Sequence, residues 1–574
     1  MDELAAQAAA LVARRPQDAR LRRVGTSRAG TPLWLLSVGH GSRQALVVAG
    51  PHANEPVGGA TALRLAERVL ADPRLSEGAD ATWNLLLCLD PDGSRRNEGW
   101  LSGPYSLGRY FRNFFRPGFL EQPEWLPDGA AGARLPETRA LLAVQDELRP
   151  FLQCSLHGVD VGGGFVELTR DLPGLARRVA HTATRLGIPR ELGPYDTLYW
   201  PSLGPAVYRI PPPRRGDLAA AITEAAVEST WYHPHRHGTV TAVVEAPMWG
   251  VAAVENGAPP ADANAILRTV SHTLRHDTHI LEQLLARIRP YVQGGAETGT
   301  DAGADAGVGL GAWGLDARPR PAADPVGPPT WDTVEGRPRP DVDAAGESGG
   351  SHSGAGGLGT STAAAPGAGV VGSPAVAQPG VGVAGPPTVP LSDSRRQPVA
   401  EPAGMPTRDT TDPMPRVTST ARPRTLVVPD AARLLAPVDD YLLVCPGLAD
   451  AWDPDVDTGA ARPLPPLNSA HLAALRIAGR RLALRTAGLL YQLVVASGRD
   501  PAGVLPELDR LIDEWCADYR DGCGARWISV ARQVEYQSRV VLSAFELALR
   551  HAPVRSRSGE PGWGTETAVP MHRE

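Results

Sequence analysis

The chain has 574 residues, a formal net charge of -6 at pH 7 and 42% hydrophobic residues. Its length exceeds that of one typical domain, and its apolar content is enough to form a real core. The small net charge gives no global electrostatic argument for a nucleic-acid partner. Apolar runs stay short of the ~20 residues that span a bilayer. We therefore expect a soluble protein with no nucleic-acid partner and no membrane partner.

The five cysteines and the N-terminus bear on the cellular compartment. An odd number of cysteines in a long chain, with no CxxC pair, suits a reducing compartment better than a disulfide scaffold. Asp2 and Glu3 precede the apolar stretch 4–13, where a secretory signal would carry positive charge. These features predict a cytoplasmic protein.

Residues 1–292 alternate between helix and strand patterns. A helical pattern near 2–14 comes first, and strand patterns at 33–38 and 44–48 follow. The later segments, in chain order, are a helix at 59–70, a strand at 84–89, a helix at 136–149, strands at 151–156 and 240–245, and a helix at 262–290. Near-continuous apolar strands are typical of a sheet that is covered on both faces. The alternation predicts an α/β domain with a largely parallel or mixed sheet.

The composition changes at about residue 293. From 293 to 425 Gly, Ala, Pro, Ser and Thr dominate, and such a segment cannot bury enough apolar surface to offset chain entropy. Helical patterns resume near residue 426, and their apolar stripes indicate core positions. The predicted parts are an α/β domain at 1–292, a disordered linker at 293–425, a small helical unit at 426–552 and a disordered tail at 553–574.

Three candidate metal ligands follow predicted strands. His52 and Glu55 lie in the turn after the strand 45–50, in the pattern HxxE, and His157 directly follows the strand 151–156. Two imidazoles and one carboxylate are a known ligand set for catalytic zinc, with a fourth position left for water. Sites in open α/β sheets gather at the carboxyl ends of strands, so these side chains can converge on one ion. HxxE alone is a weak signal, because it occurs by chance in many proteins.

A fourth candidate, Glu245, ends the apolar strand pattern 240–244. A buried glutamate needs an ion-pair partner or a raised pKa. A raised pKa suits a general base that takes a proton from a water on the metal. The alternative is a structural ion pair between Glu245 and an arginine.

Six features in the same order resemble the zinc metallocarboxypeptidase family (carboxypeptidase A-like peptidases) over roughly residues 22–290. They are the opening Gly25–Leu33, His52 and Glu55 in Pro-His-Ala-Asn-Glu-Pro, Asp90-Pro91-Asp92-Gly93 with Asn97, Pro136–Leu141, His157-Gly158, and Glu245. The resemblance implies a mixed, mostly parallel eight-stranded sheet flanked by helices, and it makes 1–292 the catalytic domain. It also implies one Zn²⁺ ion held by His52, Glu55 and His157. The implied reaction is hydrolysis of C-terminal peptide bonds through a zinc-bound water activated by Glu245.

The residues that would bind substrate depart from the family pattern. Arg112 occupies the place of the arginine that grips a terminal carboxylate, although Phe111 replaces a neighbouring asparagine. A forked guanidinium matches a carboxylate in geometry. Arg96 lies near the place of the arginine that neutralises the oxyanion. Tyr232 falls in the region where the family has a mobile tyrosine over the site.

Two further points stay open on the sequence. The aspartate that orients a zinc histidine in the family is replaced by Arg109, so we expect Asp160 or Asp92 to supply the acceptor that such a histidine needs. The segment HPHRH at 233–237 could hold a second metal, but a polar turn is the commoner use of such a loop.

Two alternatives to a carboxypeptidase follow from the same residues. Zinc N-acyl amino acid amidohydrolases resembling aspartoacylase and succinylglutamate desuccinylase use the same HxxE…H scaffold, so the substrate is either a peptide or an acyl amino acid. A non-catalytic scaffold with a degenerate peptidase fold would bind a protein partner through the C-terminal helical unit. The intact set of His52, Glu55, His157 and Glu245 opposes the scaffold.

Overall fold

The computed structural model describes residues 1–126, 134–211, 229–293, 428–457, 464–498, 500 and 503–550. All of them fall within one compact unit built from Met1–Gly314 and Ala421–Glu574. Nearly all of the predicted linker 293–425, and the whole predicted tail 553–574, lie outside the described residues. Among the described helices, none combines the length and the apolar character needed to cross a membrane.

A mixed sheet of ten strands lies at the centre of the unit, in the order β1-β2-β4-β3-β5-β9-β6-β8-β7, with β10 paired to β9. The strands are β1 (Ala19–Thr26), β2 (Pro32–Val38), β3 (Arg43–Ala49), β4 (Ala81–Leu86), β5 (Leu152–Gly162), β6 (Phe165–Leu168), β7 (Ser202–Gly204), β8 (Val207–Arg209), β9 (Val240–Gly250) and β10 (Arg526–Trp527). The predicted α/β fold is confirmed. The sheet has ten strands where the resemblance implied eight, and β7, β8 and β10 are only two or three residues long.

The central strands β4, β3, β5 and β9 run parallel to one another, and antiparallel strands flank them on both sides. Every residue of β5 is buried, as are ten of the eleven residues of β9. This burial explains their nearly continuous apolar sequence, since both faces of the central sheet are covered.

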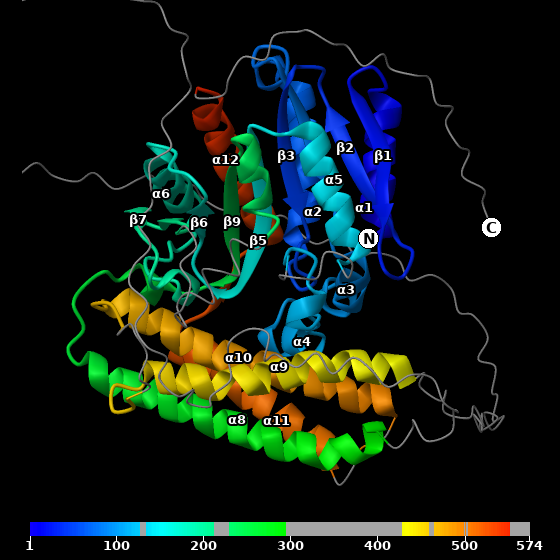
Figure 1. Cartoon of the computed structure of the whole chain (residues 1–574). Helices are drawn as coiled ribbons and strands as arrows, with labels where there is room; N and C mark the ends of the chain where they lie inside the picture. Colours follow the sequence, from blue (N-terminus) through cyan, green and yellow to red (C-terminus); the bar gives the residue numbers. More distant parts are fainter. Residues whose placement is uncertain are drawn as a thin grey trace, which may run out of the picture. The chain divides into compact units, whose positions relative to one another are not determined.

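Helices cover both faces of the sheet (Figure 1). On one face, α1 (Asp2–Arg14), α2 (Val57–Ala71), α6 (Leu175–Leu186) and α12 (Val530–Leu549) share a single apolar core with the strands. On the other face, α5 (Pro136–Leu148) packs Leu141 and Val144 against residues of β2, β3 and β4. Two shorter helices, α3 (Pro91–Arg96) and α4 (Leu107–Arg112), follow β4.

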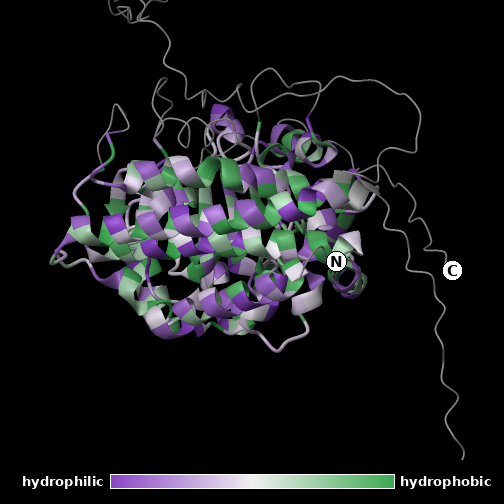
Figure 2. Cartoon of the chain, turned by 90° about the horizontal axis from the view of Figure 1, so that it is seen from below, coloured by the Kyte–Doolittle hydropathy of each residue, from purple (hydrophilic) through white to green (hydrophobic). Residues whose placement is uncertain are grey.

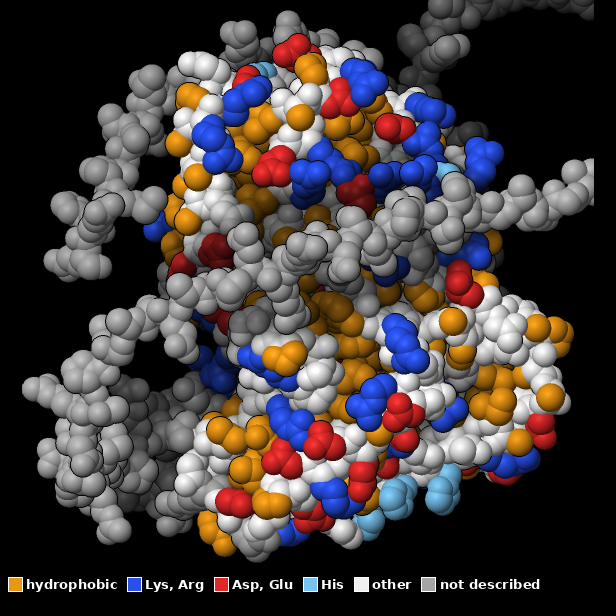
Figure 3. Space-filling view, turned by 180° about the vertical axis from the view of Figure 1, so that it is seen from behind, with side chains coloured by type: hydrophobic (Ala, Val, Ile, Leu, Met, Phe, Trp, Pro, Cys, Tyr) orange, Lys and Arg blue, Asp and Glu red, His pale blue; other side chains and the backbone are white. Residues whose placement is uncertain are grey.

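The last described helix, α12, is part of the sheet's core. Phe545 is 1% exposed and its ring lies 4.3 Å from that of Trp83 on β4. Thr61 of α2 donates a hydrogen bond of 2.7 Å to Gln537 of α12. Acidic and basic side chains are interspersed on the outer face seen in Figure 3. Arg178 of α6 pairs with Glu546 of α12 at 2.5 Å.

A separate layer of helices is inserted between β9 and β10 in the sequence. It consists of α8 (Ala263–Gln293), α9 (Val428–Trp452), α10 (Ser469–Ser497) and α11 (Val504–Ala517). These helices share two apolar cores, one of which also includes α4, Val161 of β5 and Met248 and Trp249 of β9. Hydrophilic and hydrophobic residues are mixed along the helices of the layer (Figure 2), and α10 is buried over most of its length. The chain thus leaves the sheet after β9, builds this layer, and returns to the sheet with β10 and α12.

The packing of α12 in the core of the sheet predicts that a substitution in this helix lowers the stability of the protein. Phe545→Ala should lower the free energy of unfolding by about 3–5 kcal/mol, because it leaves a cavity against Trp83 in the main core. Urea unfolding followed by circular dichroism measures this. Val495→Ala is the control, since Val495 is 54% exposed and should change stability by less than about 0.5 kcal/mol. Equal stability of the two variants would contradict a shared core.

Candidate metal centre

The candidate ligands come from the turn after β3 and from the middle of its parallel neighbour β5. His52 and Glu55 occupy the turn between β3 and α2, and His157 lies within β5. Gly50 starts the turn with a φ of +57°, a backbone conformation that favours glycine. A Cβ atom there would also lie 2.8 Å from the sulfur of Cys88. The local sequence therefore turns the chain sharply and delivers both ligands to the edge where β5 presents the third.

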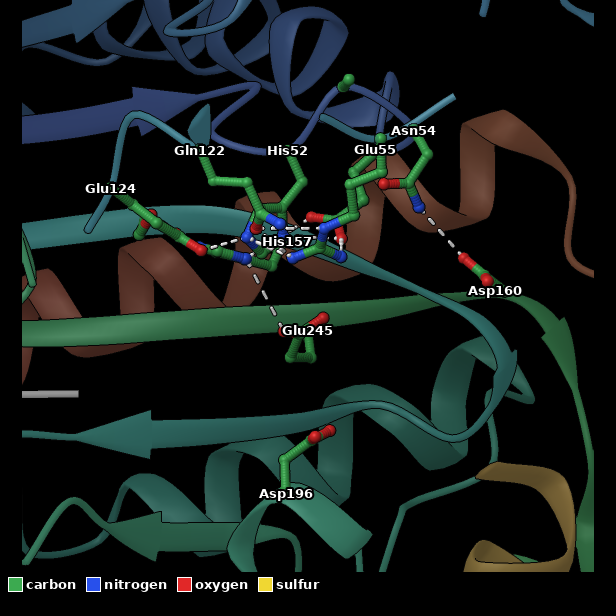
Figure 4. A network of polar contacts seen from close by, with 12 residues as sticks. His52, Asn54, Glu55, Gln122, Glu124, His157, Asp160, Asp196 and Glu245 are labelled. Atoms are coloured by element: carbon green, nitrogen blue, oxygen red, sulfur yellow. Dashed lines mark hydrogen bonds and ion pairs between the residues drawn. The ribbon is translucent and has the colours of Figure 1, made fainter. Parts of the chain in front are cut away.

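The structure brings His52, Glu55 and His157 together (Figure 4). His52 Nδ1 lies 2.8 Å from Glu55 Oε1, and His157 Nδ1 lies 3.4 Å from Glu55 Oε2. All three ligand atoms lie within 4.8 Å of one another. Ligand atoms around a tetrahedral zinc ion are about 3.4 Å apart, given bonds of about 2.0–2.1 Å. The spacing therefore fits one metal ion.

Unsatisfied polar atoms support the same conclusion. His157 Nδ1 and Glu55 Oε2 are buried and have no hydrogen-bond partner. Orphaned buried groups of this kind are rare in native proteins, and an ion between them would satisfy both. Among the residues that the structure describes, this is the one group of three potential ligand side chains that meets the distance criterion for a metal.

Glu124 supplies the acceptor that a metal-bound histidine needs. It is fully buried, contacts His52 Nε2, and lies 3.7 Å from His157 Nε2. A carboxylate at Nε2 keeps the proton on that nitrogen and leaves Nδ1 free to bind a metal. Burial would raise the pKa of Glu124, but the charge and hydrogen bond of His52, together with the charges of His157 and Arg116, lower it.

The expectation that Asp160 or Asp92 would fill this role is wrong. Asp92 accepts hydrogen bonds of 2.8 Å from Ser27 and Thr31 near the start of the chain. Asp160 pairs with Arg485 of α10. Glu124 escaped the sequence analysis because it lies in an irregular segment with no strand or helix pattern to place it.

Arg116 is the arginine that lies in the cluster. Its Nη1 is 3.5 Å from Glu55 Oε1, and its Nη2 is 2.6 Å from His52 Nε2. Gln122 orients it by accepting from Nε and Nη2 at 3.2 and 3.1 Å. A guanidinium at this position gives the site one fixed positive charge next to its carboxylates.

Arg112, which the sequence placed at the substrate, lies elsewhere. Its Nε is 2.6 Å from Asp509, and its Nη2 is 2.9 Å from Asp513, both on α11. Phe111 beside it is fully buried in the core shared with the helical layer. The sequence analysis assigned Arg112 to the substrate from its order in the family pattern, but in the structure Arg112 ties α4 to α11.

The structure places Arg96 and Tyr232 outside the ligand cluster as well. The Arg96 guanidinium lies over the ring of Phe115 at 4.8 Å. The Tyr232 ring lies 5.0 Å from that of His235. The neighbouring Trp231 is the aromatic residue that packs on His157, with ring centroids 5.4 Å apart.

The HPHRH segment forms a polar turn against α5. Nε2 of His233 and Nε2 of His237 each lie 3.1 Å from the same oxygen of Asp146. Partial burial would raise the pKa of Asp146, but hydrogen bonds from Arg236, His237 and His233 together lower it to about 2. The arrangement favours the polar turn over a second metal site.

Glu245 faces the cluster from β9. It pairs in register with His157, and its Oε1 lies 3.8 Å from His157 Nδ1. The other oxygen, Oε2, is buried without a partner. Burial raises the pKa of Glu245 well above its usual range, and the charges of Glu55 and Glu167 raise it further. The sequence left open a structural ion pair between Glu245 and an arginine. Among the described contacts, Glu245 pairs with His157 and with no arginine.

Comparisons with known proteins agree with this class of site. Residues 4–114 match the family model described as zinc carboxypeptidase, and the predicted resemblance to that family is confirmed. No curated protein matches the chain. Similar solved structures include a metallo-carboxypeptidase from Burkholderia cenocepacia (15% identity, TM-score 0.29), over 42% of this chain and 59% of that one.

Two further structures belong to animal proteins. Carboxypeptidase A from Helicoverpa armigera is 15% identical, with a TM-score of 0.30, over 43% of this chain and 64% of that one. Bovine thrombin-activatable fibrinolysis inhibitor, solved in complex with tick carboxypeptidase inhibitor, is 13% identical, with a TM-score of 0.30, over 42% and 84%. This chain spans 59% of the length of the Burkholderia protein.

The position of Glu124 leads to a prediction about metal affinity. Glu124→Gln should weaken zinc binding about 10–100-fold, because the neutral amide no longer holds the proton on His52 Nε2. Competition with a chromogenic chelator measures the affinity. Glu121→Gln is the matched control, since that side chain is 46% exposed and pairs with Arg28. If both variants hold zinc as the unmodified chain does, Glu124 has no part in the site.

Proposed function

We propose that this chain is a zinc-dependent metallocarboxypeptidase, with one Zn²⁺ held by His52, Glu55 and His157. The observation that carries the proposal is the buried cluster itself. Two imidazole nitrogens and a carboxylate converge with unsatisfied atoms, and a fourth acidic side chain, Glu245, stands beside them. The match of residues 4–114 to the zinc carboxypeptidase model supports the choice of metal and reaction.

Glu245 is the proposed general base. A zinc ion in the cluster would supply Lewis-acid chemistry, acidifying a water and polarising the scissile carbonyl. Glu245 would accept the proton of the attacking water and return it to the leaving nitrogen. Its burial and its missing partner at Oε2 suit a group that must take up a proton and release it again.

Arg116 is the proposed anion-binding residue. It replaces Arg112 and Arg96 in this role, because it is the arginine beside the ligands. A forked guanidinium can stabilise the charge that develops on the carbonyl oxygen, or grip a substrate carboxylate. Gln122 holds its orientation before substrate arrives.

A second candidate function is the N-acyl amino acid amidohydrolase. Phe111 and Arg112 contact the helical layer, so neither serves as the expected anchor for a peptide's terminal carboxylate. This observation favours the amidohydrolase. The metal chemistry is the same in both proposals. Release of C-terminal amino acids from peptides supports the carboxypeptidase, whereas cleavage of N-acyl amino acids alone supports the amidohydrolase.

The general-base role can be separated from metal binding. Glu245→Gln should keep zinc bound but reduce hydrolysis about a hundredfold or more, because the amide cannot accept the proton of water. Metal content and turnover of peptide and acyl substrates are measured on the same sample. Glu255→Gln serves as the control, since Glu255 pairs with Arg190 at 2.8 Å at the surface. Undiminished hydrolysis by the Glu245 variant rules out this mechanism.

The two arginines give opposite expectations. Arg116→Met should lower kcat/KM about a hundredfold, because a charge fixed next to the reacting group is lost. Arg112→Met should lower the melting temperature through loss of the contacts to α11 and leave kcat/KM unchanged. Steady-state kinetics and thermal unfolding of both variants decide the matter. The reverse pattern would restore Arg112 as the substrate residue.

A further inference from the structure

A buried polar network joins the inserted helices to the metal-binding turn. Arg485 of α10 donates from Nε to Asp160 Oδ2 at 2.7 Å. The other oxygen, Asp160 Oδ1, accepts from Tyr110 at 2.6 Å and from Asn54 Nδ2 at 3.2 Å. Asn54 lies between His52 and Glu55 in the sequence. Figure 4 shows Asn54 and Asp160 joined at one end of the cluster.

Every member of this network is excluded from water. Asn54, Asp160 and Tyr110 are fully buried, and Arg485 is 9% exposed. Burial would raise the pKa of Asp160, but the charge and hydrogen bond of Arg485, together with the Arg481 charge and the Tyr110 hydrogen bond, hold that pKa below its usual value. A buried carboxylate of this kind depends on its cation, because removing one partner leaves an uncompensated charge.

The helix that carries Arg485 is held close to the site. A Cβ atom at Gly488 would lie 2.2 Å from the backbone oxygen of Phe111, so α10 and α4 approach more closely than any larger residue allows. The Arg485 guanidinium also lies over the ring of Phe114 at 5.3 Å. Its direction toward β5 is thus fixed by packing on two sides.

We propose that Arg485 is a positioning residue for the metal-binding turn. By holding Asp160, it fixes Tyr110 and Asn54, and Asn54 sets the backbone that presents His52 and Glu55. The inserted helical layer therefore controls how tightly the site retains zinc. This inference rests on the proposed function, because it assumes that the cluster holds a metal.

The test measures zinc retention separately from stability. Arg485→Met and the double variant Asp160→Asn with Arg485→Met are compared with the unmodified chain. Arg480→Met is the matched control on the same helix, since Arg480 pairs with Asp277 and with Asp518 (2.7 Å) inside the helical layer. For each variant, zinc per chain, the rate of zinc loss to a chelator, and the melting temperature of the metal-free protein are recorded.

The positioning role predicts a specific pattern. Both variants at Arg485 should lose zinc about tenfold faster or more, whereas the Arg480 variant should lose it at the unmodified rate, even if its melting temperature falls. If Arg485→Met alone does not fold, the double variant decides, because it leaves neither buried charge unpaired. A folded double variant that retains zinc as tightly as the unmodified chain overturns the inference. An unmodified chain that binds no zinc contradicts the proposed function instead.

Discussion

The candidate metal centre depends on the parallel pairing of β3, β5 and β9. Ala49 pairs with Leu156, and His157 pairs with Glu245. β3 ends opposite Leu156, so the turn after β3 meets β5 beside His157. Side chains alternate along a strand, and a shift of one residue in β5 or β9 would turn His157 or Glu245 to the opposite face. The apolar residues that set the register of the buried sheet therefore also set the geometry of the site.

The core of the same sheet is completed by α12, which follows the helical layer in the sequence. α12 covers β9 and β5 beside α2 and α6, and Gln537 donates a hydrogen bond of 2.7 Å to the backbone oxygen of His157. Loop-closure entropy grows only slowly with length, so a long insertion between β9 and α12 costs little in stability. The core of the sheet is therefore built from the segment before α8 and from α12, and the helical layer is built from the segment between them.

The sequence could predict the parts of the site that regular structure carries. HxxE after an apolar strand, a histidine at the end of the next strand and Glu245 in a third are each placed by a period-two or buried-strand pattern. Glu124 and Arg116 lie in an irregular segment, where no periodicity links sequence position to direction. The region 426–552 that contains α12 is predicted to be helical, but the apolar stripe of this helix does not say which surface it covers. That surface is fixed by contacts such as Phe545 with Trp83, which are remote in sequence.

The helical layer is joined to the sheet by both apolar and polar contacts. The apolar core of α8–α11 and α4 also includes Val161 of β5 and Met248 and Trp249 of β9. The polar contact is made by β5, which carries His157 and, three residues later, Asp160, which is paired with α10. Apolar packing is non-directional and tolerates small shifts of one layer on another, whereas a buried ion pair loses much of its energy when its geometry changes. The orientation of α10 is therefore tied to the strand that holds the third ligand by a contact more exacting than the packing around it.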